Sequence, residues 1–184
     1  KKMCDEFERD FRTYNFLTND LKFDLESYEK AQNEALKYHD RMVSIINSPG
    51  NNPTGYSLAD EEWDEVIRIS KKASESGKKI TLVVDVAYIE FAGNGEQKKF
   101  FKKFAHLPEN LFVLVAFSMS KAYTSYGLRS GAAIGISQSK ESLTKRFPIQ
   151  QGLTGQTEST LPNISLSILR KMKISMNIIK NLEI

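Results

Sequence analysis

A lysine that follows a long apolar run is the residue of this chain best placed to do chemistry. Residues 111–117 are continuously apolar and are followed by Ser118, Ser120 and Lys121, with Arg129 eight residues beyond the lysine. A lysine held where a buried strand gives way to a loop is partly desolvated, which disfavours the ammonium form and leaves an amine able to attack a carbonyl. Lys121 is therefore the candidate Schiff-base residue. The two serines and the arginine are candidate ligands for an anionic group.

Two further polar clusters follow apolar runs in the same way. Asp85 and Tyr88 come after the largely apolar residues 80–84, and Asn52 lies in the turn-rich stretch that follows residues 42–46. A carboxylate at the end of a buried strand is costly unless a cation pairs with it, and the amide and the phenol can hydrogen-bond a phenolic or carbonyl oxygen. An amine, a carboxylate, hydrogen-bonding groups and a phosphate clamp are together what an aldehyde-bearing pyridinium phosphate would require.

The elements that must position these side chains alternate between strand and helix. Periodicity and turn residues predict strands over 11–17, 42–46, 80–84, 111–117 and 132–136, and helices over 25–38, 57–76 and 96–106. This order predicts an α/β fold with a mostly parallel sheet and flanking helices, whose last strand runs antiparallel because the link before it is too short for a crossover. Parallel strands bring their carboxyl ends to one edge, where the three clusters should meet.

The helix after Asn52 has the clearest boundaries. Ser57 is its expected N-cap, with Asp60 three residues on, and Gly77 is its expected C-cap. Trp63 is interpreted as core packing. The lysine-rich helix over 96–106 is interpreted as an ordinary solvated face, because its phenylalanines recur at a helical spacing that turns them toward a core.

Composition sets the broad class of the protein. With 184 residues, 40% hydrophobic and 27% charged, the chain is expected to form one soluble domain, and a net charge of +3 does not indicate a nucleic-acid or membrane partner. The single Cys4 fits a reducing compartment, the first residues do not form a signal peptide, and the apolar runs are too short to span a bilayer. We therefore expect a cytoplasmic protein.

Three motifs resemble a known family. NNPTG at 51–55, DVAY at 85–88 and SMSKAYTSYGLR at 118–129 are similar to those of the pyridoxal-phosphate (PLP) aminotransferases of fold type I, in the style of the class I/II aspartate and aromatic aminotransferases. The resemblance runs from about residue 5 to residue 147. It implies transamination between an L-amino acid and a 2-oxo acid, with aspartate or aromatic substrates, in a homodimer.

The resemblance also implies roles for the residues at these motifs. Lys121 would hold PLP as a Schiff base and then move the substrate proton, and Asp85 would pair with the pyridinium nitrogen, keeping the ring an electron sink. Tyr88 and Asn52 would hydrogen-bond the ring oxygen.

The same resemblance assigns the phosphate of PLP to three side chains. Ser118, Arg129 and Ser120 would hold it.

The resemblance covers only part of a typical family member. We expect residues 1–147 to be an incomplete PLP-binding large domain and residues 148–184 to be a divergent helical segment, with an amphipathic stripe within 161–182. The family's N-terminal phosphate loop and its C-terminal small domain, which supplies the arginine for the substrate carboxylate, are expected to lie outside the match. The choice of amino-acid substrate is therefore not readable from this sequence.

Two alternatives remain open. Carbon–sulfur lyases and aminocyclopropane-carboxylate synthases share these motifs, so the cofactor could serve a different reaction. The chain could also be a non-catalytic remnant of the fold, which a failure to bind PLP would favour. His39 and His106 show no metal-ligand spacing and are expected at the surface.

Overall fold

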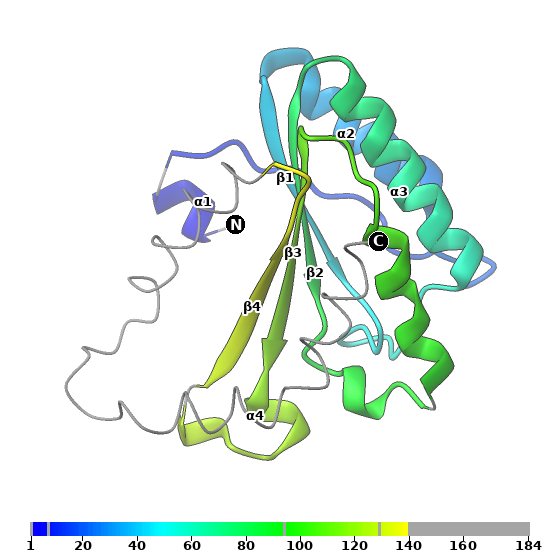
Figure 1. Cartoon of the computed structure of the whole chain (residues 1–184), viewed down its shortest axis with the longest axis vertical. Helices are drawn as coiled ribbons and strands as arrows, with labels where there is room; N and C mark the ends of the chain where they lie inside the picture. Colours follow the sequence, from blue (N-terminus) through cyan, green and yellow to red (C-terminus); the bar gives the residue numbers. More distant parts are fainter. Residues whose placement is uncertain (1, 7, 94, 129, 140–184) are drawn as a thin grey trace. The chain divides into compact units, whose positions relative to one another are not determined.

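The computed structural model describes residues 2–6, 8–93, 95–128 and 130–139 (Figure 1). The elements, in chain order, are α1 (Lys2–Glu6), α2 (Leu25–Tyr38), β1 (Arg41–Asn47), α3 (Asp60–Glu75), β2 (Lys79–Asp85), the 3-10 helices η1 (Ile89–Phe91) and η2 (Gly95–Phe104), β3 (Leu111–Ser118), α4 (Met119–Ala122), the 3-10 helix η3 (Tyr126–Leu128) and β4 (Gly131–Ile136). The predictions for residues 140–184, the helical C-terminal segment among them, lie outside the described residues.

The four strands within the described residues form one sheet in the order β1-β2-β3-β4. β1, β2 and β3 are parallel, whereas β4 pairs with β3 antiparallel. Asn47 at the end of β1 lies opposite Asp85 at the end of β2, which in turn lies opposite Ala116 near the end of β3. The predicted α/β architecture is therefore confirmed, and the carboxyl ends of the three parallel strands do share one edge.

Helices α2 and α3 pack against one face of this sheet, and η2 packs against α3 (Figure 1). Trp63 of α3 is 2% exposed and stacks on Phe100 of η2, with ring centroids 4.7 Å apart, so its interpretation as core packing is confirmed. The other face is more open, since Val43 and Ile45 are 64% and 59% exposed. The apolar run of β3 is buried over Leu111–Val113, whereas Leu114 is half-buried.

The predicted strand over residues 11–17 is wrong. This segment forms no ladder, and only an isolated bridge joins Leu17 to Phe23. Its aromatic side chains instead pack edge-on against buried rings, as Tyr14 does on Tyr28 at 5.2 Å, and the Tyr14 hydroxyl donates to the Ile45 carbonyl oxygen at 2.8 Å. Alternation here serves side-chain packing without backbone pairing.

The expected N-cap of α3 is also wrong. The helix begins at Asp60, and Glu62 Oε2 accepts from the Ala59 backbone N–H at 2.8 Å. Ser57 uses its hydroxyl elsewhere: Oγ accepts from the Gly50 N–H at 3.0 Å and so closes the loop after β1. The expected C-cap is off by one residue: Ser76 is the C-cap, and Gly77 follows it with φ +80° and donates its N–H to Ser74 O.

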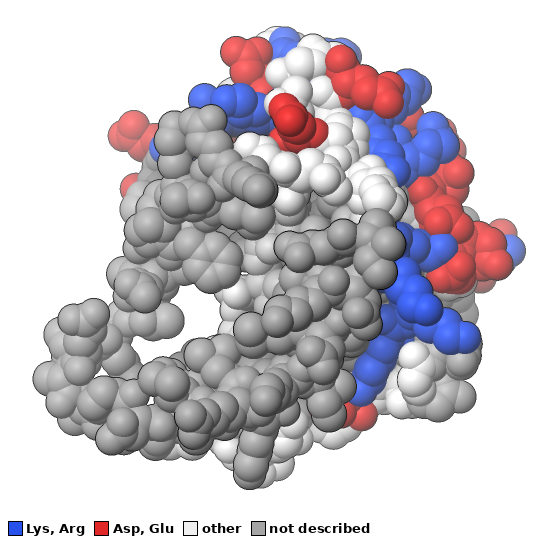
Figure 2. All heavy atoms as spheres, in the orientation of Figure 1, with Lys and Arg blue, Asp and Glu red and all other residues white. Residues whose placement is uncertain are grey.

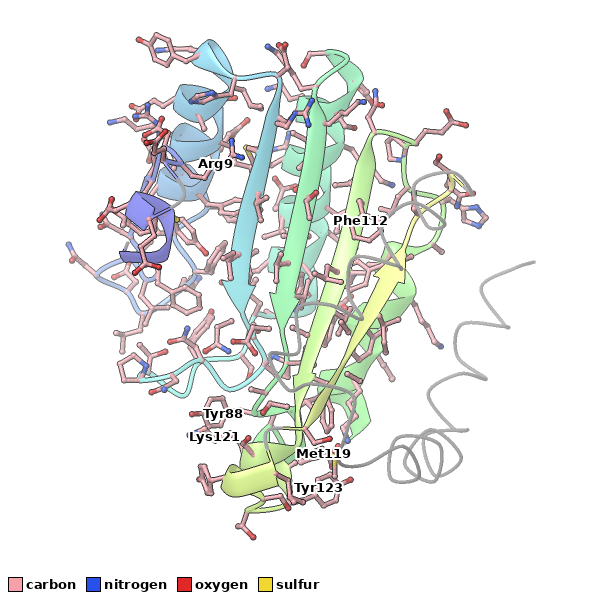
Figure 3. All side chains as sticks on the ribbon, turned by 90° about the vertical axis from the view of Figure 1, so that its left-hand side faces the viewer. Arg9, Tyr88, Phe112, Met119, Lys121 and Tyr123 are labelled. Atoms are coloured by element: carbon pink, nitrogen blue, oxygen red, sulfur yellow. The ribbon has the colours of Figure 1, made fainter. Side chains whose placement is uncertain are left out.

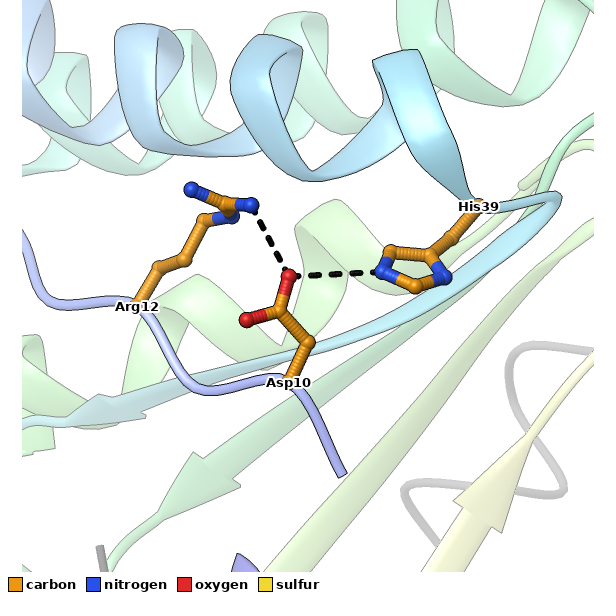
Figure 4. Close-up of polar contacts among 3 residues, drawn as sticks. All are labelled: Asp10, Arg12 and His39. Carbon is orange, nitrogen blue, oxygen red and sulfur yellow. Dashed lines mark hydrogen bonds and ion pairs between the residues drawn. The ribbon is translucent and has the colours of Figure 1, made fainter. Parts of the chain in front are cut away.

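A surface cluster ties the N-terminal segment to the end of α2 (Figure 4). Asp10 Oδ2 accepts from Arg12 Nη2 at 2.9 Å and contacts His39 Nε2 at 3.3 Å. The hydrogen bond with His39, reinforced by the Arg12 charge, holds the pKa of Asp10 below its ordinary value. His39 thus lies at the surface, as predicted.

Acidic side chains lie beside basic ones along the flank formed by α3 and η2 (Figure 2). Lys103 Nζ lies 2.8 Å from Asp60 Oδ2 and 2.7 Å from Asp64 Oδ1. This pairing supports the interpretation of the lysine-rich segment as an ordinary charged surface. Within the described ranges, the membrane-span criteria of length and apolarity are met by no helix.

Tyr28 of α2 carries a fully buried phenol. It is 0% exposed, and its oxygen accepts from Ser44 Oγ at 3.1 Å. Burial disfavours the phenolate and so raises the pKa of Tyr28 above its ordinary value of 10. A phenol with a raised folded-state pKa contributes stability that is complete below pH 10 and is lost as the pH rises toward the folded pKa.

We predict that the free energy of unfolding of Tyr28→Phe falls less steeply with pH above pH 10 than that of the parent chain. In the parent chain the free energy of unfolding should fall by up to about 1.4 kcal/mol per pH unit above pH 10 on account of this one group. The variant should lose that part of the slope, at a cost of about 1 kcal/mol at pH 8 from the missing hydrogen bond. Urea unfolding between pH 8 and 11 measures both quantities. Tyr38→Phe, at a 76% exposed position, is the control, and equal slopes in all three chains would contradict the prediction.

Candidate functional site

Asp85 is the residue around which the strand ends are joined. Its backbone oxygen accepts from Asn47 Nδ2 at 3.1 Å and from the Ser48 N–H at 3.2 Å, so the loop after β1 is fastened to the end of β2. Its half-buried carboxylate accepts from the Ala87 N–H at 3.0 Å through Oδ1. Among the described residues, Oδ2 has no hydrogen-bond partner, which leaves that oxygen available to a cationic ligand.

Asn52 and Tyr88 meet, as the sequence predicted. Asn52 Nδ2 donates to the Tyr88 hydroxyl at 3.3 Å, although the two residues are 36 positions apart. Asn52 is exposed and Tyr88 is half-buried, so the pair is accessible from solvent. The loop that carries Asn52 contains two cis peptide bonds, Ser48–Pro49 and Asn52–Pro53.

Lys121 reaches the same edge of the sheet from the segment that follows β3. It lies in α4, a helix of four residues, and its Nζ is 5.6 Å from the centroid of the Tyr88 ring and 5.0 Å from that of Tyr126. Figure 3 shows Lys121 and Tyr88 together beyond the strand ends, far from Phe112 on the sheet. A cationic group over the face of an aromatic ring gains on the order of 0.5–1 kcal/mol. The amine is therefore held at the sheet edge.

The predicted phosphate ligands are only partly described. Ser118 Oγ accepts from the Ser120 N–H at 3.2 Å, so this hydroxyl caps α4, and Ser120 itself is 6% exposed. Arg129 lies outside the described residues. The assignment of Ser118, Ser120 and Arg129 to a phosphate stays a prediction.

Sequence reasoning missed two residues that the structure brings to this edge. Tyr126 contacts the Lys121 amine, and its only signal was its place five residues after the lysine in the same motif. Asn47 bonds both to Asp85 O and, through Oδ1, to the Asn52 N–H at 2.7 Å. Asn47 directly follows the predicted strand over residues 42–46, and its position was predicted to belong to the turn.

The donor set suits PLP. A primary amine, a carboxylate with one oxygen available, a phenol and an amide lie at one edge of the sheet, and together they complement an aldehyde, a protonated ring nitrogen and a ring hydroxyl. In the part of the chain that the structure describes, no three His, Cys, Asp or Glu side chains gather in a way that could hold a metal ion.

Comparison with known proteins points to the same family. The sequence pattern described as Aminotransferase class I and II matches residues 2–178. The chain is 32% identical over 116 residues to an aromatic amino acid aminotransferase of Corynebacterium jeikeium, covering 63% of this chain and 28% of that protein. It is 43% identical over 95 residues to a histidinol-phosphate aminotransferase of Chlorobium phaeobacteroides, covering 52% of this chain and 22% of that protein.

Solved structures agree on the fold. An aminotransferase of Anaerococcus prevotii matches with a TM-score of 0.77 and 59% identity, covering 80% of this chain and 37% of that one. An aromatic-amino-acid aminotransferase of Burkholderia pseudomallei, covalently bound to pyridoxal phosphate, shares the fold with a TM-score of 0.64 and 21% identity, covering 88% of this chain and 39% of that one. The chain thus spans less than two-fifths of the length of each of these relatives. Its motifs, its fold and the match over residues 2–178 agree, and the chain belongs to the class I and II aminotransferases.

Proposed function

We propose that this chain forms the cofactor-binding part of a PLP-dependent aminotransferase that moves an amino group between an L-amino acid and a 2-oxo acid. The observation that carries the proposal is the position of the Lys121 amine 5.6 Å from the Tyr88 ring, with the Tyr88 hydroxyl bonded to Asn52 and Asp85 ending the neighbouring strand. Membership of the family and the names of the relatives support it.

The chain's own residues divide the work between binding and proton transfer. When bound, PLP supplies an aldehyde that links to an amine and a ring that accepts electron density from the substrate. Lys121 would provide the amine that holds the cofactor and, once displaced by substrate, would move the proton of the substrate Cα as a general base. The Asp85 carboxylate would pair with the protonated ring nitrogen, and Asn52 and Tyr88 would hydrogen-bond the ring oxygen.

For the substrate, we propose aspartate or an aromatic amino acid. Two relatives are named as aromatic amino acid aminotransferases, from Corynebacterium jeikeium and, at 26% identity, from Escherichia coli. The histidinol-phosphate aminotransferases among the relatives suggest histidinol phosphate as the competing substrate. We further propose that the enzyme works as a homodimer in the cytoplasm.

Gly50 is placed to control where Tyr88 lies. Its φ is +72°, a conformation that residues with a Cβ rarely adopt, and a Cβ built there would lie 2.9 Å from the Tyr88 Cβ. The Tyr88 backbone oxygen would lie 3.4 Å away, so the tyrosine could not avoid the new methyl group by a side-chain rotation alone. The geometry of the Tyr88 and Asn52 pair therefore depends on the absence of a side chain at Gly50.

The first test is covalent labelling. Purified protein mixed with PLP and reduced with borohydride should carry a stable pyridoxyl group on Lys121, located by peptide mass spectrometry. Lys121→Ala should abolish the label, whereas Lys98→Ala, which removes a surface lysine paired with Glu90, should retain it. Labels scattered over surface lysines would contradict the proposal for this chain.

The second test concerns the half-reaction. The visible absorbance of the unreduced, PLP-loaded protein should change on addition of the true amino donor, and the matching carbonyl product, a 2-oxo acid for an amino acid or a ketone for histidinol phosphate, should be detected by mass spectrometry. Aspartate, phenylalanine, tyrosine and histidinol phosphate are to be compared at equal concentration. A protein that holds PLP on Lys121 but converts none of these would keep the cofactor assignment and refute the proposed substrates.

We predict that Gly50→Ala impairs the site more than backbone strain alone explains. Both this variant and Gly77→Ala, whose φ is +80° with nothing within 4 Å of a new Cβ, should lose about 1 kcal/mol or more of stability. Only Gly50→Ala should also slow the labelling of Lys121 by PLP, because only it displaces Tyr88. Thermal unfolding and labelling rates measure the two effects, and equal labelling rates in the two variants would refute the coupling.

A further inference from the structure

We propose that Asn47 is a positioning residue of this site, whose side-chain amide sets the distance between Asp85 on one side and the Asn52–Tyr88 pair on the other. The inference rests on the proposed function for its consequence, since the spacing matters only if both groups contact one ligand. The bonds themselves stand on the geometry alone.

Both ends of the Asn47 amide are used. Nδ2 donates to the Asp85 backbone oxygen at 3.1 Å, and Oδ1 accepts from the Asn52 N–H at 2.7 Å. Asn47 is half-buried at the last position of β1. One planar group therefore joins the end of β2 to the loop that carries Asn52.

An amide suits position 47 because the side chain there must both donate and accept a hydrogen bond. A carboxylate offers acceptors alone and an alkyl group offers neither, whereas the amide presents a donor and an acceptor held rigidly apart. The strand pairing does not depend on it, because the Ser48 N–H also donates to the Asp85 oxygen at 3.2 Å. Loss of the amide should therefore free the Asn52 loop while leaving β1 paired with β2.

The contacts of Asn47 continue through Asn52 and Tyr88 toward the Lys121 amine. Asn52 Nδ2 donates to the Tyr88 hydroxyl at 3.3 Å, and the Tyr88 ring lies 5.6 Å from Lys121 Nζ. Under the proposed function, Asp85 and the Asn52–Tyr88 pair bind different atoms of one rigid ring. A site of this kind works only when its side chains are held within a fraction of an ångström of the productive spacing. Asn47 would maintain that spacing through its two hydrogen bonds.

The matched control lies in the same loop. Asn51 Nδ2 donates to the Asn47 backbone oxygen at 3.2 Å, and Asn51 Oδ1 accepts from Thr54 Oγ1 at 2.8 Å. Asn51→Ala thus removes hydrogen bonds internal to the loop and leaves the bridge from Asn47 to Asp85 and Asn52 in place. A general loosening of the loop would affect both variants alike.

The first experiment needs no cofactor. Amide hydrogen exchange of Asn52, measured by NMR on the full chain, should be about tenfold faster in Asn47→Ala, because its acceptor is gone. Asn47→Asp keeps an acceptor and should remain protected, as should Asn51→Ala. Unchanged exchange in Asn47→Ala, or equal acceleration in Asn51→Ala, would overturn the proposal.

The second experiment tests the consequence for binding. The probe is 4-deoxypyridoxine 5′-phosphate, which lacks the aldehyde and so reports on the noncovalent contacts alone. We expect its affinity to fall about tenfold in Asn47→Ala, less in Asn47→Asp, and less than threefold in Asn51→Ala. Equal affinity in the parent chain and Asn47→Ala would overturn the positioning role. If the parent chain itself fails to bind the probe, the proposed function fails for this chain, and the exchange result still decides whether Asn47 sets the position of Asn52.

Discussion

The parallel register of β1, β2 and β3 is the constraint on which the candidate site depends. Because Asn47 pairs with Asp85, and Asp85 with Ala116, the chain leaves the sheet three times at nearly the same level. The segment that follows each strand places a different functional group at this edge, although the groups lie far apart in the sequence. A shift of one residue in any of these pairings would turn Asp85 to the opposite face, because side chains alternate along a strand.

The need to satisfy backbone polar groups at that edge turns the strand ends into a connected network. Asp85 is the last paired residue of β2, and its carbonyl oxygen receives two donors, Asn47 Nδ2 and the Ser48 N–H. The same bonds that prevent an unsatisfied oxygen also fix the loop that carries Asn52. Stability and placement of the site thus share the same contacts, whereas Lys121 is held more loosely, by contacts with aromatic faces.

The core behind the sheet supports this edge from one side. Trp63 of α3 stacks on Phe100 of η2, and the buried Tyr28 of α2 bonds to Ser44 of β1, so each helix is anchored to a neighbour by a ring. The opposite face carries apolar side chains such as Val43 at 64% exposure. An apolar run in the sequence indicates what a strand could bury but not which of its faces the described elements cover.

The sequence by itself determined the alternating order of strands and helices, the antiparallel last strand, and the residue types at the strand ends, because apolar runs and turn residues act locally. It misassigned residues 11–17, whose alternation matched a strand that has no partner, and the cap of α3, because Ser57 bonds instead to Gly50 across the loop. Only the tertiary structure decided that Asn47 bridges Asp85 and Asn52 and that Tyr126 faces Lys121. Such contacts depend on the register and on side-chain direction, and no local pattern in a chain encodes either.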